Sequence, residues 1–404
     1  MNRKLAGLIL LLGSGLAAGG PALAQQCGGD FEAWKQAVAQ EARAAGIGQA
    51  GLAALAAESA SGAAALASAR LDRKVLQRDR AQGVFTQTFT EFSGRMINAY
   101  RLKNGAANLK KYADAFARAE RAYGVPGPVI AAFWALETDF GAVQGDFRTL
   151  DALATLAHDC RRPHLFRPQI VPLLTLIERG DLPADVQGAW AGEIGQTQML
   201  PADILVKGVD GDGDGHVDMR RSVPDVILTT ANNLRSHGWR GGEPWIEEVR
   251  VPDTLPWEQA GIATRLPLSQ WAAWGVTRRD GSPLGAGPDA GLALPQGRKG
   301  PAFLVFPNYD VYLEWNQSFV YTLTAAHLAA RLAGAPKFDP RSPEEGLAGE
   351  TMKLLQTKLQ ARGHDVGKVD GVLGAMTRAA VRKEQLRLGF PADGWPTPAL
   401  LANL

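Results

Sequence analysis

The sequence predicts a mainly α-helical fold, with one large helical domain and a small helical module at the C-terminus. No proline occurs between Gly28 and Gly124, where alanine is abundant and apolar residues recur at helical spacing. A further helix-length run, residues 129–141, is apolar on nearly every face. Short β-prone pieces are confined to residues 244–310, between turns rich in glycine and proline, so we expect only a small strand-rich insertion.

The N-terminus has the features of a secretory signal. Arg3 and Lys4 form a basic end, residues 5–16 are apolar, and residues 22–24 (Ala-Leu-Ala) provide an A-x-A cleavage site. Residues 1–24 are therefore predicted to be a signal peptide. The mature chain is expected to be exported to the periplasm as a soluble protein, because no later run approaches the length of a membrane span.

The net charge gives no reason to expect a polyanionic partner. The 404 residues carry a formal charge of +2, and removal of Arg3 and Lys4 brings the mature side chains to about zero (+2 minus 2). Nucleic acid and anionic lipid surfaces are therefore not expected as partners. We expect a monomer.

Two cysteines remain in the predicted mature chain, Cys27 and Cys160. An isolated pair in an oxidising compartment predicts a disulfide, which would tie the mature N-terminus to the large domain. The alternative is two unrelated thiols.

The apolar run at residues 129–141 contains one carboxylate that needs an explanation, Glu137. Pro126 and Pro128 suit the first turn of a helix and Gly141 suits its C-terminal cap, which places Glu137 in the last turn. Burial and the helix dipole would both raise the pKa of Glu137. A protonated carboxyl group in a cleft is the proton donor that cleavage of a glycosidic bond requires. The alternative is a structural glutamate that caps a loop amide.

A second segment, residues 190–201, combines glycines with amide side chains. Gly192 and Gly195 would allow a close approach of the backbone, and Gln196 and Gln198 offer amides that bind sugar hydroxyls. Loops of this composition are common, so the segment is a weak signal by itself.

A third segment, beginning at Asp210, predicts a calcium loop. It has aspartates at positions 1, 3, 5 and 9 and a glycine at position 6, as in an EF-hand. Position 12 is Arg221 rather than the usual glutamate, so Asp225 would have to close the site after a longer turn. The alternative is a solvated Asp/Gly turn. The predicted structural Ca²⁺ ligands are Asp210, Asp212, Asp214, the carbonyl of His216, and Asp225, within the loop 210–225.

The C-terminal part of the chain divides at a proline-rich stretch. Residues 25–335 are predicted to form the large domain, residues 336–346 a linker that few contacts cross, and residues 347–404 a separate module.

Together, these segments resemble the lytic murein transglycosylase B family in their order and spacing. The resemblance covers residues 31–332, most of the mature chain. The matching segments are Leu136–Gly141, Arg161-Arg162, Gly192–Pro201, the loop from Asp210, and Asn308-Tyr309 with Trp315-Asn316.

The resemblance implies a lysozyme-like catalytic domain that cleaves the MurNAc–GlcNAc β-1,4 bond of peptidoglycan without water. Glu137 takes the position of the single catalytic acid/base. It would protonate the glycosidic oxygen and then deprotonate the C6 hydroxyl, which closes a 1,6-anhydroMurNAc ring. This would make the protein a carbon–oxygen lyase acting on a polysaccharide.

The resemblance also implies substrate-binding residues. Arg161 and Arg162 match paired arginines that contact peptidoglycan, with a solvated pair at a helix end as the alternative. Asn308 and Tyr309 match cleft residues, and Gln196 and Gln198 would bind the sugars.

Two other functions stay open at this stage. Glu193, in the segment 190–201, would give a muramidase-type hydrolase if it faced the cleft and held water. A non-catalytic peptidoglycan-binding protein is the other alternative. The products separate the three: anhydro sugars, reducing ends, or no release.

The C-terminal module resembles the peptidoglycan-binding domain 1 group, which implies a small three-helix wall-binding fold. The pattern is carried by Leu355-Gln356, Leu359, Gly363, Asp370-Gly371, Gly374, Thr377, Ala380-Val381 and Asp393-Gly394. Glu384 stands where that group commonly has an aromatic residue, and a charged residue there weakens the argument for a core position or shifts the helix register.

Overall fold

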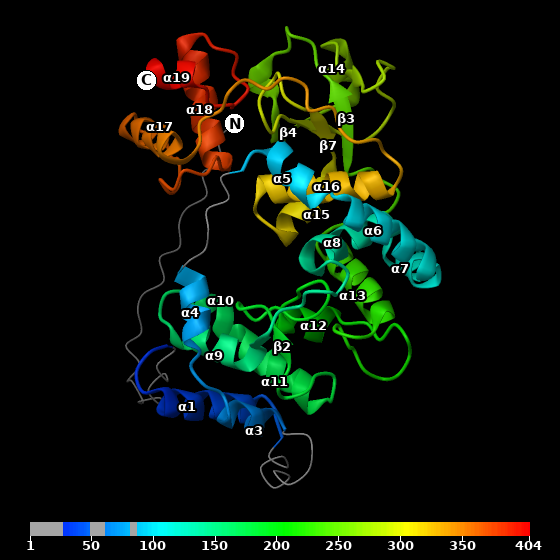
Figure 1. The fold of residues 1–404 in the computed structure, drawn as a ribbon, viewed down its shortest axis with the longest axis vertical. Coiled ribbons are helices and arrows are strands. Elements are labelled where there is room, and N and C mark those ends of the chain that lie inside the picture. Colours follow the sequence, from blue (N-terminus) through cyan, green and yellow to red (C-terminus); the bar gives the residue numbers. More distant parts are fainter. Residues whose placement is uncertain (1–26, 49–60, 81–86) are drawn as a thin grey trace, which may run out of the picture.

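The computed structural model describes residues 27–48, 61–80 and 87–404. The predicted signal peptide, residues 1–24, lies outside these ranges. The molecule is elongated, with the C-terminal module at one end and helix α1 (Phe31–Ala44) at the other (Figure 1). None of the helices in the described ranges is long and apolar enough to cross a membrane.

Helices form the body of the large domain and pack around one apolar core. Its shorter helical segments are α10 (Pro163–Phe166), η1 (Arg167–Gln169) and α12 (Pro201–Lys207). The remaining helices are α3 (Gly62–Ala67), α4 (Arg73–Arg80), α5 (Phe89–Met96), α6 (Ala99–Lys111), α7 (Ala113–Tyr123), α8 (Gly127–Thr138), α9 (Thr149–His158), α11 (Ile170–Glu178), α13 (Val223–Ser236), α15 (Pro307–Trp315) and α16 (Phe319–Leu332).

Helix α8 lies at the centre of this domain, as the apolar run predicted. Val129 to Ala135 are almost fully buried, with α6, α7, α13 and α16 packed around the helix (Figure 1). Burial of each large apolar side chain is worth about 1.5–3 kcal/mol, so packing outweighs intrinsic helix propensity here. The expected cap at Gly141 is wrong: the helix ends at Thr138, and Asp139, with a φ of 50°, is the left-handed cap residue.

The predicted strand-rich insertion is a five-stranded antiparallel sheet in the order β4-β6-β7-β3-β5. It has its own apolar core, in which Trp271 and Phe306 are buried. The strands are β3 (Ile246–Arg250), β4 (Gly261–Leu266), β5 (Thr277–Arg278), β6 (Ala290–Ala293) and β7 (Phe303–Val305), accompanied by η2 (Trp257–Gln259) and α14 (Leu268–Ala273). A separate two-stranded pair joins β1 (Phe147–Arg148) to β2 (Gln187–Gly188).

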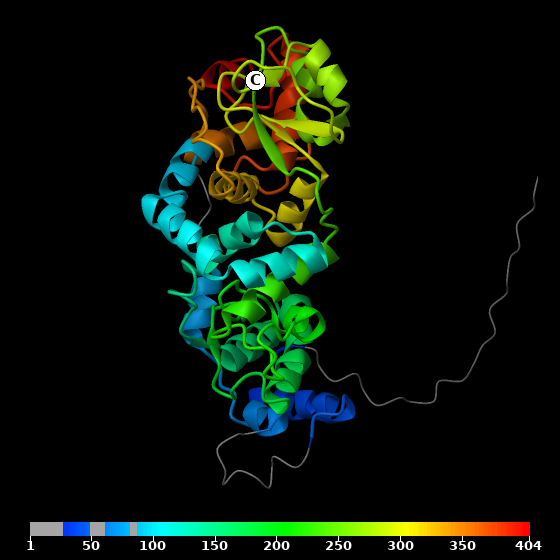
Figure 2. The same cartoon turned by 90° about the vertical axis from the view of Figure 1, so that its right-hand side faces the viewer.

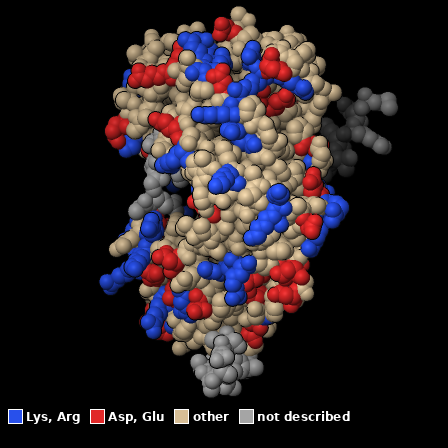
Figure 3. Space-filling view, turned by 45° about the vertical axis from the view of Figure 1, so that its right-hand side comes forward, with Lys and Arg blue, Asp and Glu red and all other residues tan. Residues whose placement is uncertain are grey.

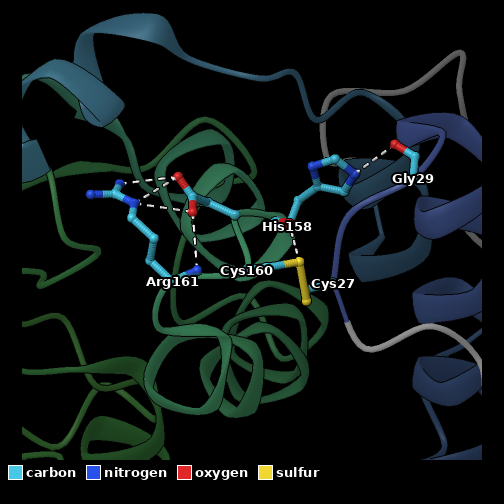
Figure 4. Close-up of a disulfide and its surroundings, with 6 residues drawn as sticks. Cys27, Gly29, His158, Cys160 and Arg161 are labelled. Atoms are coloured by element: carbon cyan, nitrogen blue, oxygen red, sulfur yellow. Dashed lines mark hydrogen bonds and ion pairs between the residues drawn. A yellow bond between two sulfur atoms is a disulfide. The ribbon is translucent and has the colours of Figure 1, made fainter.

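The predicted disulfide between Cys27 and Cys160 is confirmed, with 5.3 Å between the Cα atoms. The same contact is reinforced by the Gly28 N–H, which donates to the carbonyl oxygen of His158 at 2.8 Å. The His158 ring also contacts the carbonyl of Gly29 at 3.1 Å (Figure 4). A cross-link over 133 residues is worth roughly 4–5 kcal/mol in the loop-entropy model.

The C-terminal module has the three expected helices, α17 (Gly349–Ala361), α18 (Ala375–Leu388) and α19 (Pro398–Ala402), around a small core. Glu384 is buried at the side of that core, within α18. Its buried carboxylate pairs with His364 Nε2 and with Arg387 Nη2, each at 2.7 Å. These partners neutralise the charge, which explains how a carboxylate replaces an aromatic ring there.

The expectation that few contacts cross the linker is wrong. Arg378 of α18 is buried and donates to the carbonyl oxygens of Leu294 and Pro295, at 3.4 and 2.8 Å. Arg382 donates to the carbonyl oxygen of Ala260 at 3.1 Å. The module is therefore docked against the β4–β6 edge of the sheet (Figure 2).

The face of the molecule seen in Figure 3 has no strong bias of charge. In Figure 3, Lys and Arg side chains are interspersed with Asp and Glu on the visible face. This agrees with a net charge near zero.

Candidate active site

The structure places Glu137 in the last turn of α8, against the N-terminal part of α16 and the end of α15. Its Oε1 accepts a hydrogen bond from Trp315 Nε1 at 2.9 Å and a second, short one from the Tyr321 hydroxyl. Among the described residues, no donor contacts Oε2. One oxygen is thus fixed by the protein, which leaves the other for a proton.

Opposing effects act on the pKa of Glu137. Burial raises the pKa and is the largest effect, while the hydrogen bonds from Tyr321 and Trp315 lower it. The charge of Glu193 adds a smaller increase. The resulting pKa is above the ordinary value for glutamate, which favours the protonated acid.

Tyr321 remains a donor in this arrangement. Burial and the neighbouring Glu137 raise the pKa of Tyr321 well above its ordinary value, so its hydroxyl keeps its proton. Asp139, two residues after Glu137, accepts from Arg101 Nε at 2.7 Å and so belongs to the support of the helix end.

No sequence pattern predicts a site role for Trp315 or Tyr321. Trp315 belongs to a segment that matches the family, and Tyr321 lies in a run that predicts only a helix. Only the packing of α15 and α16 on α8 brings both side chains to Glu137.

Gln196 is part of the scaffold. Its side chain is 6% exposed, its Oε1 accepts from Trp134 Nε1 at 2.8 Å, and its Nε2 donates to the carbonyl oxygen of Arg220 at 3.0 Å. Both ends of the amide are therefore used inside the protein, which corrects its expected role as a sugar ligand. Its backbone carbonyl accepts from Thr138 Oγ1 at 2.6 Å and fastens the loop to the end of α8.

Gln198 is more accessible than Gln196. Its Nε2 donates to the carbonyl oxygens of Gly195 and Gln144, at 2.8 and 3.3 Å. No described residue donates to its Oε1. The carbonyl end of this amide is therefore available for a sugar hydroxyl.

Asn308 and Tyr309 are not cleft residues, contrary to the expectation. Both side chains are fully buried. The Asn308 amide bonds the backbone of Arg240 and Glu243, and the Tyr309 hydroxyl contacts Thr322 Oγ1 at 2.9 Å. Asn308 therefore anchors the segment between α13 and β3, and Tyr309 contacts α16.

Arg161 and Arg162 lie after α9, beside the disulfide, and Arg161 is shown in Figure 4. Their side chains are 41% and 37% exposed, and both pair with the buried carboxylate of Asp79. Arg161 also pairs with Asp159 at 3.0 Å, and its hydrogen bonds lower the pKa of Asp159. Asp79 and Asp159 hold the two guanidinium groups in place. The exposed parts of the Arg161 and Arg162 side chains are open to an anionic ligand.

The acidic loop brings three of its predicted ligands together. One oxygen each from Asp210, Asp212 and Asp214 lies within 4.8 Å of the others. The loop bends sharply there because Gly213 and Gly215 have φ values of 83° and 93°. Three hard oxygen donors in an open turn fit a calcium ion.

The other two predicted ligands stand apart from this cluster. The His216 ring contacts Asp181 at 3.2 Å, so only its backbone carbonyl is left for a metal. Asp225 is fully buried, and its two oxygens accept from the Gly211 and Asp218 N–H groups, at 2.8 and 2.7 Å. Asp225 thus closes the loop through the backbone, which corrects the expectation that it completes the cluster.

Comparisons with known proteins agree with this architecture. A family model described as transglycosylase SLT domain matches residues 30–330, and a model of a peptidoglycan binding domain matches residues 348–404. The curated membrane-bound lytic murein transglycosylase B of Escherichia coli strain K12 is 32% identical over 242 residues. That match spans 59% of this chain and 66% of the relative, just under two thirds of its length.

Solved structures extend the similarity to nearly the whole chain. SltB3 from Pseudomonas aeruginosa, solved in complex with NAG-anhNAM-pentapeptide, is 36% identical with a TM-score of 0.83, over 93% of this chain and 99% of that one. The Escherichia coli lytic transglycosylase Slt35, solved in complex with calcium, is 28% identical with a TM-score of 0.62. The match covers 76% of this chain and 96% of the Slt35 chain.

Proposed function

The chain belongs to the transglycosylase SLT domain family, and from this premise we propose that it is an exported lytic transglycosylase of peptidoglycan. It cleaves the MurNAc–GlcNAc β-1,4 bond without water and leaves 1,6-anhydroMurNAc ends. The observation that carries the proposal is the environment of Glu137, a partly buried glutamate with one carboxyl oxygen anchored and the other without a donor among the described residues. The SltB3 complex with an anhydro-sugar fragment supports the same product.

In the first step, Glu137 acts as a general acid. Because Trp315 and Tyr321 both donate to Oε1, the proton is carried by Oε2. Burial raises the pKa of Glu137, which favours the protonated form. Transfer to the glycosidic oxygen releases the GlcNAc-side hydroxyl, and positive charge develops at C1 of MurNAc, where its N-acetyl group stabilises it.

In the second step, the Glu137 carboxylate acts as a base. It takes the proton of the C6 hydroxyl of the same MurNAc, whose oxygen bonds to C1 and closes the anhydro ring. Glu137 is protonated again, and no water is consumed. The hydrogen bonds from Trp315 and Tyr321 stabilise the transient carboxylate of Glu137. Burial therefore favours the protonated form that acts in the first step, and the two donors favour the carboxylate that acts in the second.

Binding of the polymer is proposed to involve several parts of the chain. Gln198 offers its free amide oxygen to a sugar, and Arg161 with Arg162 offers two guanidinium groups to lactyl or peptide carboxylates. The domain at 347–404 would bind the wall, with residues 336–346 as the connection and residues 25–335 as the catalytic domain. The predicted signal peptide supports a location in the periplasm.

Tyr321→Phe should lower kcat about tenfold, because it removes one hydrogen bond worth about 1.4 kcal/mol from the Glu137 carboxylate. That hydrogen bond lowers the pKa of Glu137, so its loss raises the pKa. Activity needs protonated Glu137, and the alkaline limb of kcat/KM should therefore move to higher pH. Tyr312→Phe is the matched control, because the buried Tyr312 hydroxyl has no hydrogen-bond partner in the part of the chain that the structure describes. An unchanged pH profile in Tyr321→Phe would contradict this role.

Product analysis tests the proposed function directly. Purified sacculi are digested with the full-length enzyme, and the released muropeptides are identified by mass spectrometry. Anhydro ends are expected. Reducing ends would show a hydrolase instead, and the absence of any release would show a binding protein.

A structural calcium ion is proposed for the acidic loop, supported by the Slt35 complex and by the Asp210, Asp212 and Asp214 cluster. The ion would be held by these carboxylates with the His216 carbonyl, and it would neutralise their repulsion. It takes no part in the proton transfers of Glu137.

A chelator should lower the melting temperature of the wild-type protein. Calcium at 100 times its Kd contributes about 2.7 kcal/mol, which corresponds to roughly 5–10 °C. Combined Asp210→Ala and Asp214→Ala should remove this sensitivity, whereas Asp253→Ala, at an exposed aspartate of the sheet region, should retain it. Identical melting curves with and without chelator would count against a bound ion.

A further inference from the structure

The segment that carries both hydrogen-bond donors to Glu137 is less deeply buried than the helix that follows it. Trp315 is the last residue of α15, and Tyr321 lies in the first turn of α16. Residues 318–321 are half-buried, whereas residues 322–329 of the same helix are buried. The first turn of α16 is therefore fixed by less packing than the rest of the helix, and other contacts must hold it in place.

One side of this first turn is held from within the large domain. The Tyr309 hydroxyl contacts Thr322 Oγ1 at 2.9 Å, and Thr322 Oγ1 lies 3.0 Å from the carbonyl oxygen of Ser318. Ser318 caps the helix, and its Oγ accepts from the Tyr321 N–H at 3.3 Å. None of these bonds involves the side chain of Phe319, the first residue of α16.

The C-terminal module supplies a contact to that side chain, through Arg378 of α18. Its Cζ atom lies 5.0 Å from the centre of the Phe319 ring and 5.8 Å from that of Trp395. The guanidinium group is buried, and it donates to the carbonyl oxygens of Leu294 and Pro295 at 3.4 and 2.8 Å. The attraction between a guanidinium and an aromatic face is strongest where water is excluded. Arg378 thus fixes the first turn of α16 relative to the sheet.

A cavity of about 190 Å³ lies between the sheet and the module, beside this contact. Phe319 and Arg378 both line it, together with residues of β4 and β6. Because there is empty space next to the Phe319 ring, loss of the guanidinium group would leave the ring with fewer neighbours and with room to move.

We propose that Arg378 is a positioning residue for the active site: through Phe319 it holds the first turn of α16, and with it the hydroxyl of Tyr321, against Glu137. The C-terminal module is then part of the catalytic unit. The active site is fully ordered only while the module is docked, so a ligand that drew the module off the sheet would slow cleavage. This inference rests on the proposed function of Glu137 and adds a regulatory element to it.

The test is a double-mutant cycle in the full-length enzyme. Kinetics are measured on a soluble glycan, so that binding to the insoluble wall does not contribute. Arg378→Ala should lower kcat roughly three- to tenfold with KM little changed. In a Tyr321→Phe background, the same substitution should have no further effect, because the hydroxyl that it positions is already absent. A wild-type kcat, or an equal loss in both backgrounds, would overturn the inference.

The pH dependence of kcat/KM is a second readout, which a general loss of stability would not shift. The Tyr321 hydrogen bond lowers the pKa of Glu137, so a weaker bond raises this pKa. The alkaline limb of Arg378→Ala should move to higher pH, by no more than in Tyr321→Phe. Trp315 and Glu193, the other groups that act on the pKa of Glu137, are retained in this variant. A limb at the wild-type position would contradict the proposed role of Arg378.

Arg382→Ala is the matched control. Arg382 also donates from α18 to the sheet, at the carbonyl oxygen of Ala260, 3.1 Å away. In the described part of the chain it makes no hydrogen bond, ion pair or ring contact with α16. Its alkaline limb should coincide with that of the wild type. An equal shift of the limb in Arg382→Ala and Arg378→Ala would overturn the assignment to the Phe319 contact.

Phe319→Leu covers the case in which Arg378→Ala does not fold. It removes the aromatic face but keeps an apolar side chain, and the hydrogen bonds of Arg378 to the sheet are retained. Its alkaline limb should also move to higher pH, and a limb at the wild-type position would overturn the inference.

A titration separates this inference from the proposed function, because it does not depend on turnover. In protein with ¹³C-labelled glutamate carboxyls, the NMR titration midpoint of Glu137 should be higher in Phe319→Leu than in the wild type. An unchanged midpoint would overturn the positioning role alone. A wild-type protein that releases nothing from sacculi would refute the proposed function, while a raised midpoint would still support the contact between the module and the site.

Discussion

Glu137→Gln is expected to abolish the release of 1,6-anhydro muropeptides from sacculi while the protein stays folded. The amide keeps the shape of the side chain, and its carbonyl oxygen still accepts from Trp315 and Tyr321. It has no proton to give to the glycosidic oxygen and cannot take one from the C6 hydroxyl. General acid–base catalysis is worth roughly 10²–10⁴-fold, and here one residue serves both steps.

The measurement is mass spectrometry of the released products, with circular dichroism and a melting curve to establish the fold. Glu314→Gln is the control for the same chemical change, because Glu314 is exposed on α15 and is adjacent to Trp315 in the sequence. It should behave as the wild type. Activity of Glu137→Gln within a few-fold of the wild type would remove Glu137 from the mechanism.

Removal of the C-terminal module after Glu345 is expected to destabilise the large domain as well as to weaken its binding to sacculi. The cut exposes the apolar edge around Leu292 and Leu294, which the module covers. A loss on the order of a few kcal/mol would lower the melting temperature by roughly 5–10 °C. The sequence alone predicted an independent module on a linker, so an unchanged melting temperature would favour that earlier prediction.

A single substitution can weaken the docking of the C-terminal module on the sheet without removal of the module itself. Arg378→Ala leaves the carbonyl oxygens of Leu294 and Pro295 without their donor, while the rest of the module is retained. Burial and the nearby Arg382 lower the pKa of Arg378 to about 9, so the guanidinium is still charged at neutral pH. The variant should melt earlier, whereas Lys383→Ala, at an exposed position of α18, should not.

The sequence was most informative where local pattern and chemistry coincide. The apolar run predicted α8 and the last-turn position of Glu137. A helix that is buried on all faces is apolar at consecutive positions, so a short stretch of sequence is enough to identify it. The disulfide was predicted from the presence of two cysteines in a chain with a predicted signal peptide. The acidic loop predicted the cluster of three aspartates because all three lie within five residues of one another.

The remaining features depend on contacts between distant segments. Tyr321 donates a hydrogen bond to Glu137, 184 residues away in the sequence, and the periodicity of a sequence does not predict such a contact. Asn308 and Tyr309 were predicted to be cleft residues because they match the family's motif, yet both side chains are buried in the interior. Arg378 and Arg382, four residues apart on a helix, have the spacing of a solvated face. The docked sheet edge buries Arg378 and partly buries Arg382.

The bond between Cys27 and Cys160 closes the chain into a covalent ring that contains α8 and therefore Glu137. A chain that crosses a membrane N-terminus first presents Cys27 well before Cys160, so the ring stays open until α9 has also emerged. Since the sequence contains only two cysteines, an oxidant has one intramolecular pairing to make and no wrong pairing to correct. In the proposed export, the order of translocation would set the moment at which the segment that carries Glu137 is closed into this ring.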